Sequence, residues 1–257
     1  MSRTHICCQR LVKHMPASWD EVAADYHRTV GDTGDSYHRT YVNPVIFEIL
    51  GDVKGLHILD LACGQGYLSR ILARKGAEVI GVDISEKMLK LAQESEESES
   101  LGVKYVLCSS ANMSGIQDSS IDCVVSTFGF HDIKDVDQTI EECSRVLKDR
   151  GRLVFAIPHP LSYARRSQDE DGYFLKMRHY MSNQDIPHPK YKENGVMAYH
   201  RPLSYYFEKA FSVGLKMMAF REITTQMSRG RPIKDEQLLA YKQEIPGFLV
   251  VGFKKTE

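Results

Sequence analysis

The sequence predicts an α/β fold in which helices cover both faces of a mostly parallel sheet. Five apolar runs alternate with stretches in which apolar residues recur every three or four positions, a glycine-rich turn follows the first run, and two more apolar runs lie close together near the C-terminus. Parallel strands need long crossover connections, so this alternation is typical of helices packed over a parallel sheet.

The central elements follow one another in a regular order. The predicted strands are residues 56–61, 77–82, 103–107, 121–127 and 151–157, and the predicted helices between them are residues 66–74, 85–95 and 134–148. Gly76 ends the first of these helices, and Ser85 is a suitable N-cap for the second.

The C-terminal part departs from this alternation. After a predicted helix at residues 203–214, two apolar stretches at 215–223 and 247–253 complete seven strands, and their closeness in sequence favours an antiparallel addition at one edge of the sheet. Residues 223–246 contain Gly230, Pro232 and Pro246, which favour an irregular connection.

Two regions lie outside the predicted sheet. Residues 18–29 and 39–50 are expected to form helices that cap the domain, with a turn-rich segment at 31–35 between them. Residues 158–202 contain five of the nine prolines and many aromatic residues, so we expect an irregular insertion that acts as a lid. The expected organisation is a flexible N-terminus at 1–17 and one domain at 18–257.

Composition excludes several classes of function. The formal net charge of −1 offers no overall positive field for nucleic acid. No apolar run approaches the ~20 residues of a membrane span, and the first residues lack the apolar core of a signal peptide, so a cytoplasmic protein is expected. The six cysteines form no CxxC pair and are expected to be reduced and mostly structural.

The most informative motif begins in the first predicted strand, where Asp60-Leu-Ala-Cys-Gly64-Gln-Gly66 runs from a buried strand into a glycine turn and a helix. Glycines allow a tight turn and close approach of a ligand to the backbone. Asp83 ends the second strand about twenty residues later, where a carboxylate can bind ribose hydroxyls. A nicotinamide-binding protein would favour a third glycine at position 69, which is Ser69 here.

Together these motifs resemble those of the class I S-adenosylmethionine-dependent methyltransferases. The matching segments are residues 60–66, 81–85, 109–112, 121–128 and 143–153, and the resemblance extends over about residues 18–254. It implies a Rossmann-like fold with a seven-stranded, mostly parallel sheet and an antiparallel edge strand, together with the N-terminal helices and the lid insertion.

The resemblance also implies roles for individual residues in binding S-adenosyl-L-methionine. It places the glycine loop under the methionine part of the cofactor and Asp83 at the ribose. The side chains expected near the adenine are Ile84, Met88, Ala111 and Asn112, and those expected beside the sulfonium are Thr127 and Phe128. Tyr26 of the N-terminal helix would close over the cofactor, and Asp60 can reach a cationic amino group. The implied cofactor-binding residues are Tyr26, Asp60, Ala62, Cys63, Gly64, Gly66, Asp83, Ile84, Met88, Ser110, Ala111, Asn112, Thr127 and Phe128.

Methyl transfer needs a positioned nucleophile and, for some acceptors, a base. His131 follows the fourth strand, at the sheet edge where ligands bind in such folds, and is the first candidate for a base. His27, His159 and His200 are alternatives. The acids Asp132, Asp135 and Asp137 lie at the start of a helix, where capping and the helix dipole favour acids, so no metal is predicted.

The acceptor is expected to be a small molecule. The segment Ser126-Thr-Phe-Gly-Phe130 lacks the Asn/Asp-Pro-Pro-aromatic signature of nucleic-acid amino-methyltransferases and the Pro-Cys nucleophile of cytosine C5 enzymes. Aromatic residues from the cap and the insertion would line an apolar pocket. The sequence does not distinguish an oxygen, nitrogen or carbon acceptor. A non-catalytic S-adenosylmethionine sensor is the main alternative to an enzyme, although the large lid region favours an enzyme. An NAD(P)-dependent oxidoreductase is a further alternative that Ser69 argues against. The oligomeric state is left open.

Overall fold

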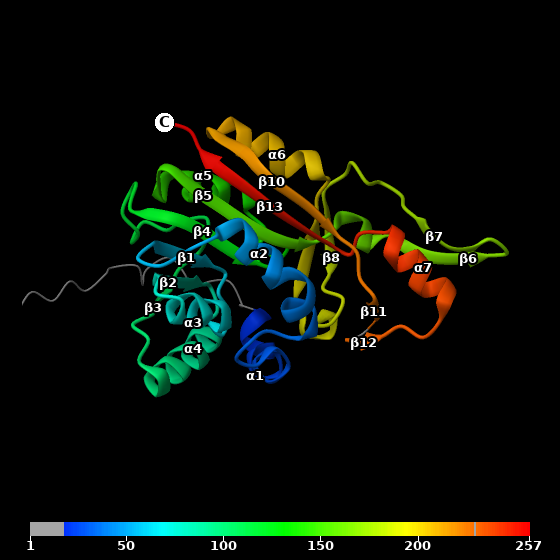
Figure 1. The fold of residues 1–257 in the computed structure, drawn as a ribbon, viewed down its shortest axis with the longest axis horizontal. Coiled ribbons are helices and arrows are strands. Elements are labelled where there is room, and N and C mark those ends of the chain that lie inside the picture. The colour runs from blue at the N-terminus through cyan, green and yellow to red at the C-terminus, as the bar shows by residue number, and fades with distance from the viewer. Residues whose placement is uncertain (1–17, 229) are drawn as a thin grey trace, which may run out of the picture.

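The computed structural model describes residues 18–228 and 230–257. The expected flexible segment 1–17, with Cys7 and Cys8, lies outside these residues. A twisted seven-stranded sheet forms the centre of the molecule, with the strand order β10-β13-β5-β4-β1-β2-β3 (Figure 1). Its strands are β1 (His57–Leu61), β2 (Glu78–Asp83), β3 (Lys104–Leu107), β4 (Ile121–Thr127), β5 (Leu147–Pro158), β10 (Leu215–Ile223) and β13 (Phe248–Lys255).

The sheet is mostly parallel, as the sequence predicts. Strands β3, β2, β1, β4 and β5 pair in parallel. Strand β13 runs antiparallel to both β5 and β10, so the antiparallel addition lies at the β5 side of the sheet. The carboxyl ends of β1, β2, β3 and β4 therefore meet along one edge, where the Rossmann-like fold binds its ligands.

Each face of the sheet is covered by helices, because neighbouring strand residues point to opposite sides. On one face, Leu59 and Val124 pack in a hydrophobic cluster with α5 (Val136–Val146) and α6 (Leu203–Ser212). On the other, Ile58 and Val125 pack with α2 (Asn43–Leu50) and α3 (Tyr67–Arg74). The two clusters hold the strand ends rigidly in place.

The central predicted elements are all present, with ends shifted by at most four residues. Helix α4 (Glu86–Glu99) is longer than predicted. The helix predicted for 134–148 is wrong at its end, because Leu147 already pairs with Ile121 as the first residue of β5. The two N-terminal cap helices are present as α1 (Ser18–Val30) and α2, and the second is preceded by a π-helical turn at His38–Val42.

Two predictions of irregular structure are wrong. Residues 223–246 contain a short pair, β11 (Met227–Ser228) and β12 (Arg231–Pro232), and a helix, α7 (Glu236–Glu244). The insertion 158–202 contains two hairpins, formed by β6 (Arg165–Asp169) with β7 (Gly172–Lys176) and by β8 (Gln184–Pro187) with β9 (Met197–His200). Helix α7 buries no residue and β6 is entirely polar, so neither carries the apolar periodicity on which sequence prediction depends.

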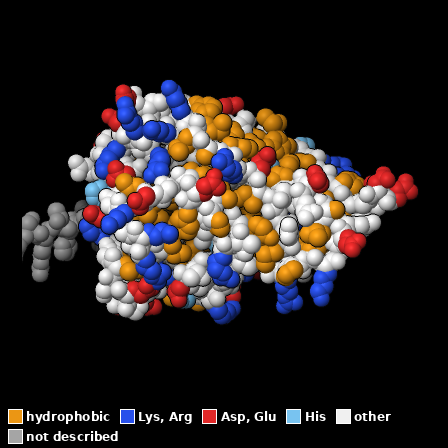
Figure 2. Space-filling view, in the orientation of Figure 1, with side chains coloured by type: hydrophobic (Ala, Val, Ile, Leu, Met, Phe, Trp, Pro, Cys, Tyr) orange, Lys and Arg blue, Asp and Glu red, His pale blue; other side chains and the backbone are white. Residues whose placement is uncertain are grey.

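Surface and cysteines agree with the composition. On the face shown in Figure 2, basic and acidic side chains are interspersed rather than gathered into a basic patch. Cys63, Cys108, Cys123 and Cys143 are buried and none forms a disulfide. In the part of the chain that the structure describes, no helix combines the length and apolarity needed to cross a membrane.

Candidate active site

The glycine turn after β1 has the backbone conformation that its sequence requires. Ala62, Gly64 and Gly66 all have positive φ, at 56°, 55° and 78°. A Cβ on Gly66 would lie 2.3 Å from the hydroxyl oxygen of Tyr105, so position 66 needs glycine for its conformation and for space. The turn leads directly into α3, whose first amide groups face the loop.

Asp83 connects the end of β2 to this loop. Its Oδ2 accepts a hydrogen bond from the Gly64 amide at 2.8 Å, and its Oδ1 accepts one from the Ser85 amide at 2.9 Å. Burial raises the pKa of Asp83 above its ordinary value, although these amides act against the shift. The carboxylate and the glycine loop are therefore close enough to contact one ligand together.

Asp60 lies beneath the loop and is almost fully buried. Its Oδ2 accepts a hydrogen bond from Ser69 Oγ at 2.5 Å, and burial raises its pKa to about 7. The structure thus gives Ser69 a definite role at the position where a nicotinamide-binding loop favours glycine.

The residues implied at the adenine lie on the loops after β2 and β3. Ser85 caps α4 by accepting a hydrogen bond from the Met88 amide at 3.1 Å. Ile84 and Met88 therefore lie at the start of α4, directly after Asp83. The Cys108 amide donates to the Asp83 carbonyl at 3.1 Å, so the segment containing Ser110, Ala111 and Asn112 begins beside the end of β2. Ser110 Oγ lies 3.0 Å from Thr139 Oγ1 of α5.

The end of β4 turns sharply at Phe128. This residue has a φ of 58°, which is rare outside glycine and marks a constrained position. The Oγ of Ser126 is buried without a hydrogen-bond partner among the described residues, whereas the Thr127 side chain interacts with the Tyr67 hydroxyl. An unpartnered buried hydroxyl fits a ligand that supplies a polar atom at this strand end.

The N-terminal cap is tied to the glycine loop. Gln65 Nε2 donates to the Gly31 carbonyl at 2.7 Å, and Arg70 donates to the Asp32 carboxylate at 3.1 Å. The Tyr26 ring comes within 3.5 Å of the position that a Cβ on Gly64 would take. Burial raises the pKa of Tyr26, as do the carboxylates of Asp35, Asp132 and Asp83, which are all close enough to act on it. The cap therefore covers a strongly acidic region.

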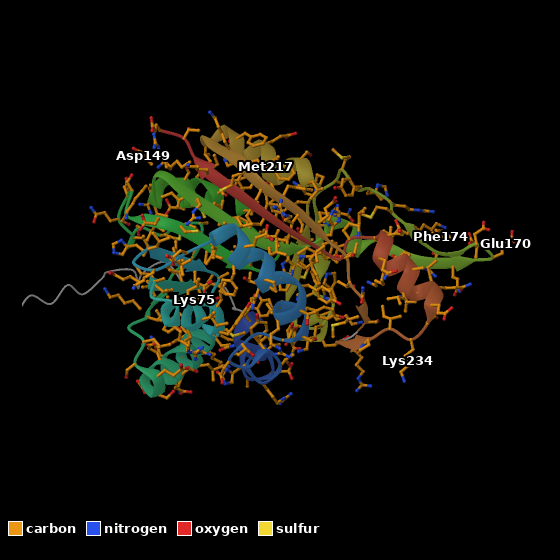
Figure 3. All side chains as sticks on the ribbon, viewed as in Figure 1. Lys75, Asp149, Glu170, Phe174, Met217 and Lys234 are labelled. Carbon is orange, nitrogen blue, oxygen red and sulfur yellow. The ribbon has the colours of Figure 1, made fainter. Side chains whose placement is uncertain are left out.

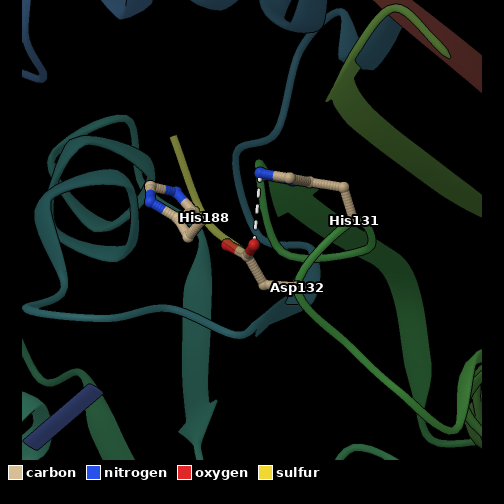
Figure 4. A group of neighbouring side chains, drawn as sticks. All are labelled: His131, Asp132 and His188. Carbon is tan, nitrogen blue, oxygen red and sulfur yellow. Dashed lines mark ion pairs between the residues drawn. The ribbon is translucent and has the colours of Figure 1, made fainter. Parts of the chain in front are cut away.

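His131, Asp132 and His188 form a group beyond the end of β4 (Figure 4). One ligand atom of each lies within 4.8 Å of the others, and His131 Nε2 is 3.3 Å from Asp132 Oδ1. Burial lowers the pKa of His131 to about 3 and raises that of Asp132. His131 Nδ1 and Asp132 Oδ1 are buried without a hydrogen-bond partner in the described residues.

The composition of this group resembles a metal site, but the tautomer of His188 argues against one. A neutral imidazole binds a metal only through the nitrogen that carries no proton. His188 Nδ1 already accepts hydrogen bonds from the amides of Lys190 at 3.2 Å and Tyr191 at 3.1 Å, which places the proton on Nε2. In this arrangement neither nitrogen of His188 offers a free lone pair to a metal, and we propose no metal here.

The other candidate histidines lie apart from this group. His27 lines a groove of about 340 Å³ between α1 and α4, which contains none of the implied cofactor residues. His200 donates from Nε2 to the Tyr180 carbonyl at 2.8 Å. His159 donates from Nε2 to Glu222 at 3.0 Å and accepts the Leu161 amide at Nδ1.

Sequence reasoning missed three residues of the site region: His38, Asp35 and His188. His38 lies 4.9 Å from Phe128 between ring centroids, and its Nδ1 is 2.8 Å from Asp35 Oδ1. The Asp35-x-x-His38 spacing within the turn-rich segment was the available signal. His188 lies in the insertion, and no motif connects it to the end of β4.

Comparisons with known proteins identify relatives that are methyltransferases. A family described as a methyltransferase domain matches residues 59–155. A demethylmenaquinone methyltransferase of Thermotoga maritima is 30% identical over 169 residues, which cover 64% of this chain and 70% of the relative. A ubiquinone biosynthesis O-methyltransferase of Coxiella burnetii is 28% identical over 151 residues, and the chain spans 63% of that relative's length.

Solved structures show the same fold. An S-adenosylmethionine-dependent methyltransferase of Mesorhizobium loti superposes with a TM-score of 0.70 and 25% identity, covering 82% of this chain and 96% of that one. A phosphoethanolamine N-methyltransferase of Haemonchus contortus, solved in complex with S-adenosyl-L-methionine, gives a TM-score of 0.63 at 19% identity, covering 93% of this chain and 57% of that one. This chain therefore belongs to the class I S-adenosylmethionine-dependent methyltransferase family.

Proposed function

We propose that this protein is an enzyme that transfers the methyl group of S-adenosylmethionine to a small-molecule acceptor bound beyond the end of β4. The observation that carries the proposal is the hydrogen bond from the Gly64 amide to Asp83, because it holds the glycine loop next to the acid that would bind the ribose, so that both could contact one ligand. The unpartnered buried hydroxyl of Ser126 at the end of β4 supports the same site.

The cofactor-binding residues keep the roles that the sequence implies. Gly64 and Gly66 would lie under the methionine part, and Asp83 would accept hydrogen bonds from the ribose. Ile84, Met88, Ala111 and Asn112 would surround the adenine, and Ser110 would hold their loop against α5. Thr127 and Phe128 would form the wall beside the sulfonium, while Tyr26 would close the site. Asp60, with Ala62 and Cys63 beside it, would stabilise the cationic amino group.

The electrostatics suit a positively charged ligand. S-adenosylmethionine supplies a methyl group activated by a sulfonium. Asp35 is ionised, and the buried carboxyl groups of Asp83 and Asp132, whose pKa values are raised by burial, would ionise beside a bound cation, so the poorly solvated region under the cap favours positive charge. The cap and the glycine loop exclude water and hold the reacting groups in line, which is the main contribution a protein makes to such a transfer.

We propose an aromatic hydroxyl compound as the acceptor class. Phe128 and the rings of His38 and His131 lie together at the end of β4 and suit a planar molecule. The names of the relatives from Coxiella and Thermotoga, which refer to ubiquinone and menaquinone chemistry, support acceptors of this kind. His131 would hydrogen-bond the acceptor. His27 and His200 are second choices. His27 lines a separate groove, and Nε2 of His200 already donates a hydrogen bond to the Tyr180 carbonyl.

The second half of the insertion is the proposed lid. The Tyr199 amide of β9 donates to the His131 carbonyl at 2.7 Å, and Tyr191 packs against Trp19 of α1 with ring centroids 5.8 Å apart. These contacts connect the insertion to both walls of the site. We propose that residues 18–257 act as one methyltransferase domain, with the cap at 18–50 and the lid within 158–202, and that it works in the cytoplasm.

A turnover assay tests the proposed function. The protein is incubated with S-adenosylmethionine and, separately, with catechol, 3,4-dihydroxybenzoate, hydroquinone and a phenethylamine, and the products are followed by mass spectrometry. We expect a methylated phenol and an equal amount of S-adenosylhomocysteine. Binding of S-adenosylmethionine without product from any of the four would favour a non-catalytic sensor, and binding of NADH alone would favour an oxidoreductase.

A further inference from the structure

We propose that His38, oriented by Asp35, is the group that takes the proton from the methyl acceptor. Both residues lie in the N-terminal cap, between α1 and α2, and not at the strand ends where such a base is usually sought. The inference rests on the proposed function, because the proton belongs to the acceptor of the methyl group.

Asp35 and His38 form a fixed pair. Asp35 Oδ1 lies 2.8 Å from His38 Nδ1, and it also accepts hydrogen bonds from the amides of Tyr37 at 2.8 Å and His38 at 3.0 Å. Partial burial acts to raise the pKa of Asp35, but the hydrogen bonds and the neighbouring imidazole keep it below its ordinary value. The carboxyl group is therefore ionised and can only accept hydrogen bonds.

This ionised acceptor determines the tautomer of His38. Nδ1 must carry the proton, because two lone pairs facing one another at 2.8 Å would repel. The Asp35 amide also donates towards Nδ1, which favours the other tautomer, but at 3.3 Å this contact is the longer and weaker of the two, and the ionised carboxylate at 2.8 Å prevails. The lone pair of the neutral ring is then on Nε2, which is buried and has no hydrogen-bond partner in the described chain. His38 is only 3% exposed, so leaving Nε2 without a hydrogen bond destabilises the folded protein, and a ligand that donates a hydrogen bond to it would remove this cost.

The pair is held next to the expected position of the methyl group. The His38 ring packs edge-to-face on Tyr67, the first residue of α3, with centroids 5.1 Å apart, and on Phe128 at 4.9 Å. Phe128 contacts His131 on its other side, at 6.2 Å. Because Gly31, four residues before Asp35, is bonded to Gln65 of the glycine loop, the pair is fixed between that loop and the end of β4.

The backbone around His38 is tightly packed. A Cβ on Gly34 would lie 2.5 Å from His38 Cβ and 3.1 Å from the Tyr67 ring, so position 34 needs glycine. His38 also opens the π-helical turn His38–Val42. Such turns are rare and are frequent at functional sites.

His131 is the less suitable proton acceptor of the two. Burial, with His188 and Arg201 nearby, lowers the pKa of His131 to about 3, and an efficient base has a pKa closer to the working pH. The titratable groups around His38 are Asp35 and Arg39 of its own turn and Tyr67 of α3, with Tyr26 of α1 near Asp35. Asp35 contacts the ring directly and favours its protonation, whereas the Arg39 guanidinium, which donates to the Gly34 carbonyl, acts in the opposite direction.

The acceptor loses its proton to His38 as it gains the methyl group. As the acceptor oxygen forms its bond to the methyl carbon, the carbon–sulfur electron pair stays on sulfur, and the hydroxyl proton passes to His38 Nε2. The resulting imidazolium is stabilised by the ionised Asp35 and later releases its proton to solvent. The neutral methylated acceptor then leaves.

Nitrogen-15 NMR of the whole protein tests the tautomer without any acceptor. We expect His38 to carry its proton on Nδ1 at pH 8, with and without S-adenosylhomocysteine, and Asp35→Asn to shift the proton towards Nε2. A wild-type ring protonated only on Nε2 would overturn the inference, because no lone pair would face the acceptor.

Kinetics with the acceptor found in the turnover assay test the role. We expect His38→Gln to lower kcat about 100-fold or more, to leave the KM for S-adenosylmethionine within about twofold, and to remove the loss of activity at low pH. The matched control is His159→Gln. His159 is also buried and paired with a carboxylate, but its partner is Glu222 of β10 rather than a residue of the cap. Asp35→Asn is the second variant should His38→Gln fail to bind the cofactor.

The outcomes separate the two proposals. If the wild type binds S-adenosylmethionine and turns over, and His38→Gln is as active as His159→Gln with an unchanged pH profile, the inference is wrong and the proposed function stands. If the wild type gives no methylated product, the proposed function fails, and the tautomer measured by NMR still decides whether His38 has a free nitrogen.

Discussion

Three buried carboxyl groups, Asp60, Asp83 and Asp132, have pKa values raised by burial. In the described residues none of them forms an ion pair with a lysine or arginine side chain. A bound sulfonium and ammonium would supply the missing positive charge. We expect these carboxyl groups to become ionised when the cofactor binds. In the empty site no positive charge compensates them, so their ionisation as the pH rises lowers the free energy of unfolding.

Asp60 gives the clearest test of this effect. Its pKa is raised from 3.8 to about 7, so the folded protein retains a proton that the unfolded chain has lost, and stability falls as the pH rises from about 4 to about 7. We expect Asp60→Asn to change the free energy of unfolding little at pH 4.5 and to raise it, relative to wild type, by at most about 4 kcal/mol at pH 8. Urea unfolding at both pH values measures this. An equal difference at the two values would contradict it.

Gly66 tests the shape of the loop. We expect Gly66→Ala to lower the free energy of unfolding by about 2 kcal/mol or more and to weaken cofactor binding, because the new Cβ meets Tyr105 and the φ of 78° is unfavourable. Gly102→Ala is the matched control, with a φ of 84° and no atom within 4 Å of its Cβ, and should cost only about 1 to 2 kcal/mol. Equal losses in the two variants would argue against a steric role for position 66.

At the scale of elements, one serine joins two helices. Ser85 Oγ accepts the Met88 amide at the start of α4 and lies 2.5 Å from Asp20 Oδ1 of α1, to which it donates. We expect Ser85→Ala to lower the free energy of unfolding by about 1 to 2 kcal/mol, since it removes the cap and the bond to α1. Ser98→Ala, near the exposed end of α4, should change it by less than about 0.5 kcal/mol. Urea unfolding compares them, and similar values would show that the cap contributes nothing.

The elements also differ in how well the sequence predicts them. Strands such as β1 and β4 and helices such as α5 carry a clear apolar periodicity, so their positions follow from the sequence. Helix α7 and strand β6 lack it and are held by contacts distant in sequence, such as the hydrogen bond from Gln168 Nε2 of β6 to Gln237 Oε1 of α7 at 3.1 Å. Residues with a chemical motif, such as Asp83, could be predicted for the site. The Asp35-x-x-His38 spacing indicates a side-chain pair, but the position of His38 in the site could not be predicted, because it depends on the cap folding back onto Phe128.

At the scale of the whole molecule, the β6–β7 hairpin and α7 project from one end of the sheet (Figure 1). Phe174 of β7 is exposed, and Glu170 lies at the tip of the hairpin (Figure 3). The packing between these elements consists of a few side-chain contacts, including Tyr173 with Tyr241 at 6.0 Å between ring centroids. We name residues 165–176 and 236–244 together the distal arm.

Hydrogen exchange tests the independence of the distal arm. We expect its amides to exchange at least about 100-fold faster than those of β1 and β4, because little apolar area holds it to the sheet. S-adenosylhomocysteine should slow exchange in the glycine loop and in the cap around Tyr26, and leave the distal arm unchanged. Equal protection of the arm and β1, or slowing in the arm on ligand binding, would contradict this.

The central claim is that Asp83 and the glycine loop bind S-adenosylmethionine, and isothermal titration tests it most directly. Wild type, Asp83→Asn and Asp149→Asn are each titrated with S-adenosylmethionine, S-adenosylhomocysteine and NADH; Asp149 is an exposed acid far along the sequence from the loop (Figure 3). We expect the first two ligands to bind wild type and Asp149→Asn alike, and Asp83→Asn at least about tenfold more weakly, a loss of about 1.4 kcal/mol. Binding of NADH alone, or equal binding by all three proteins, would contradict the account.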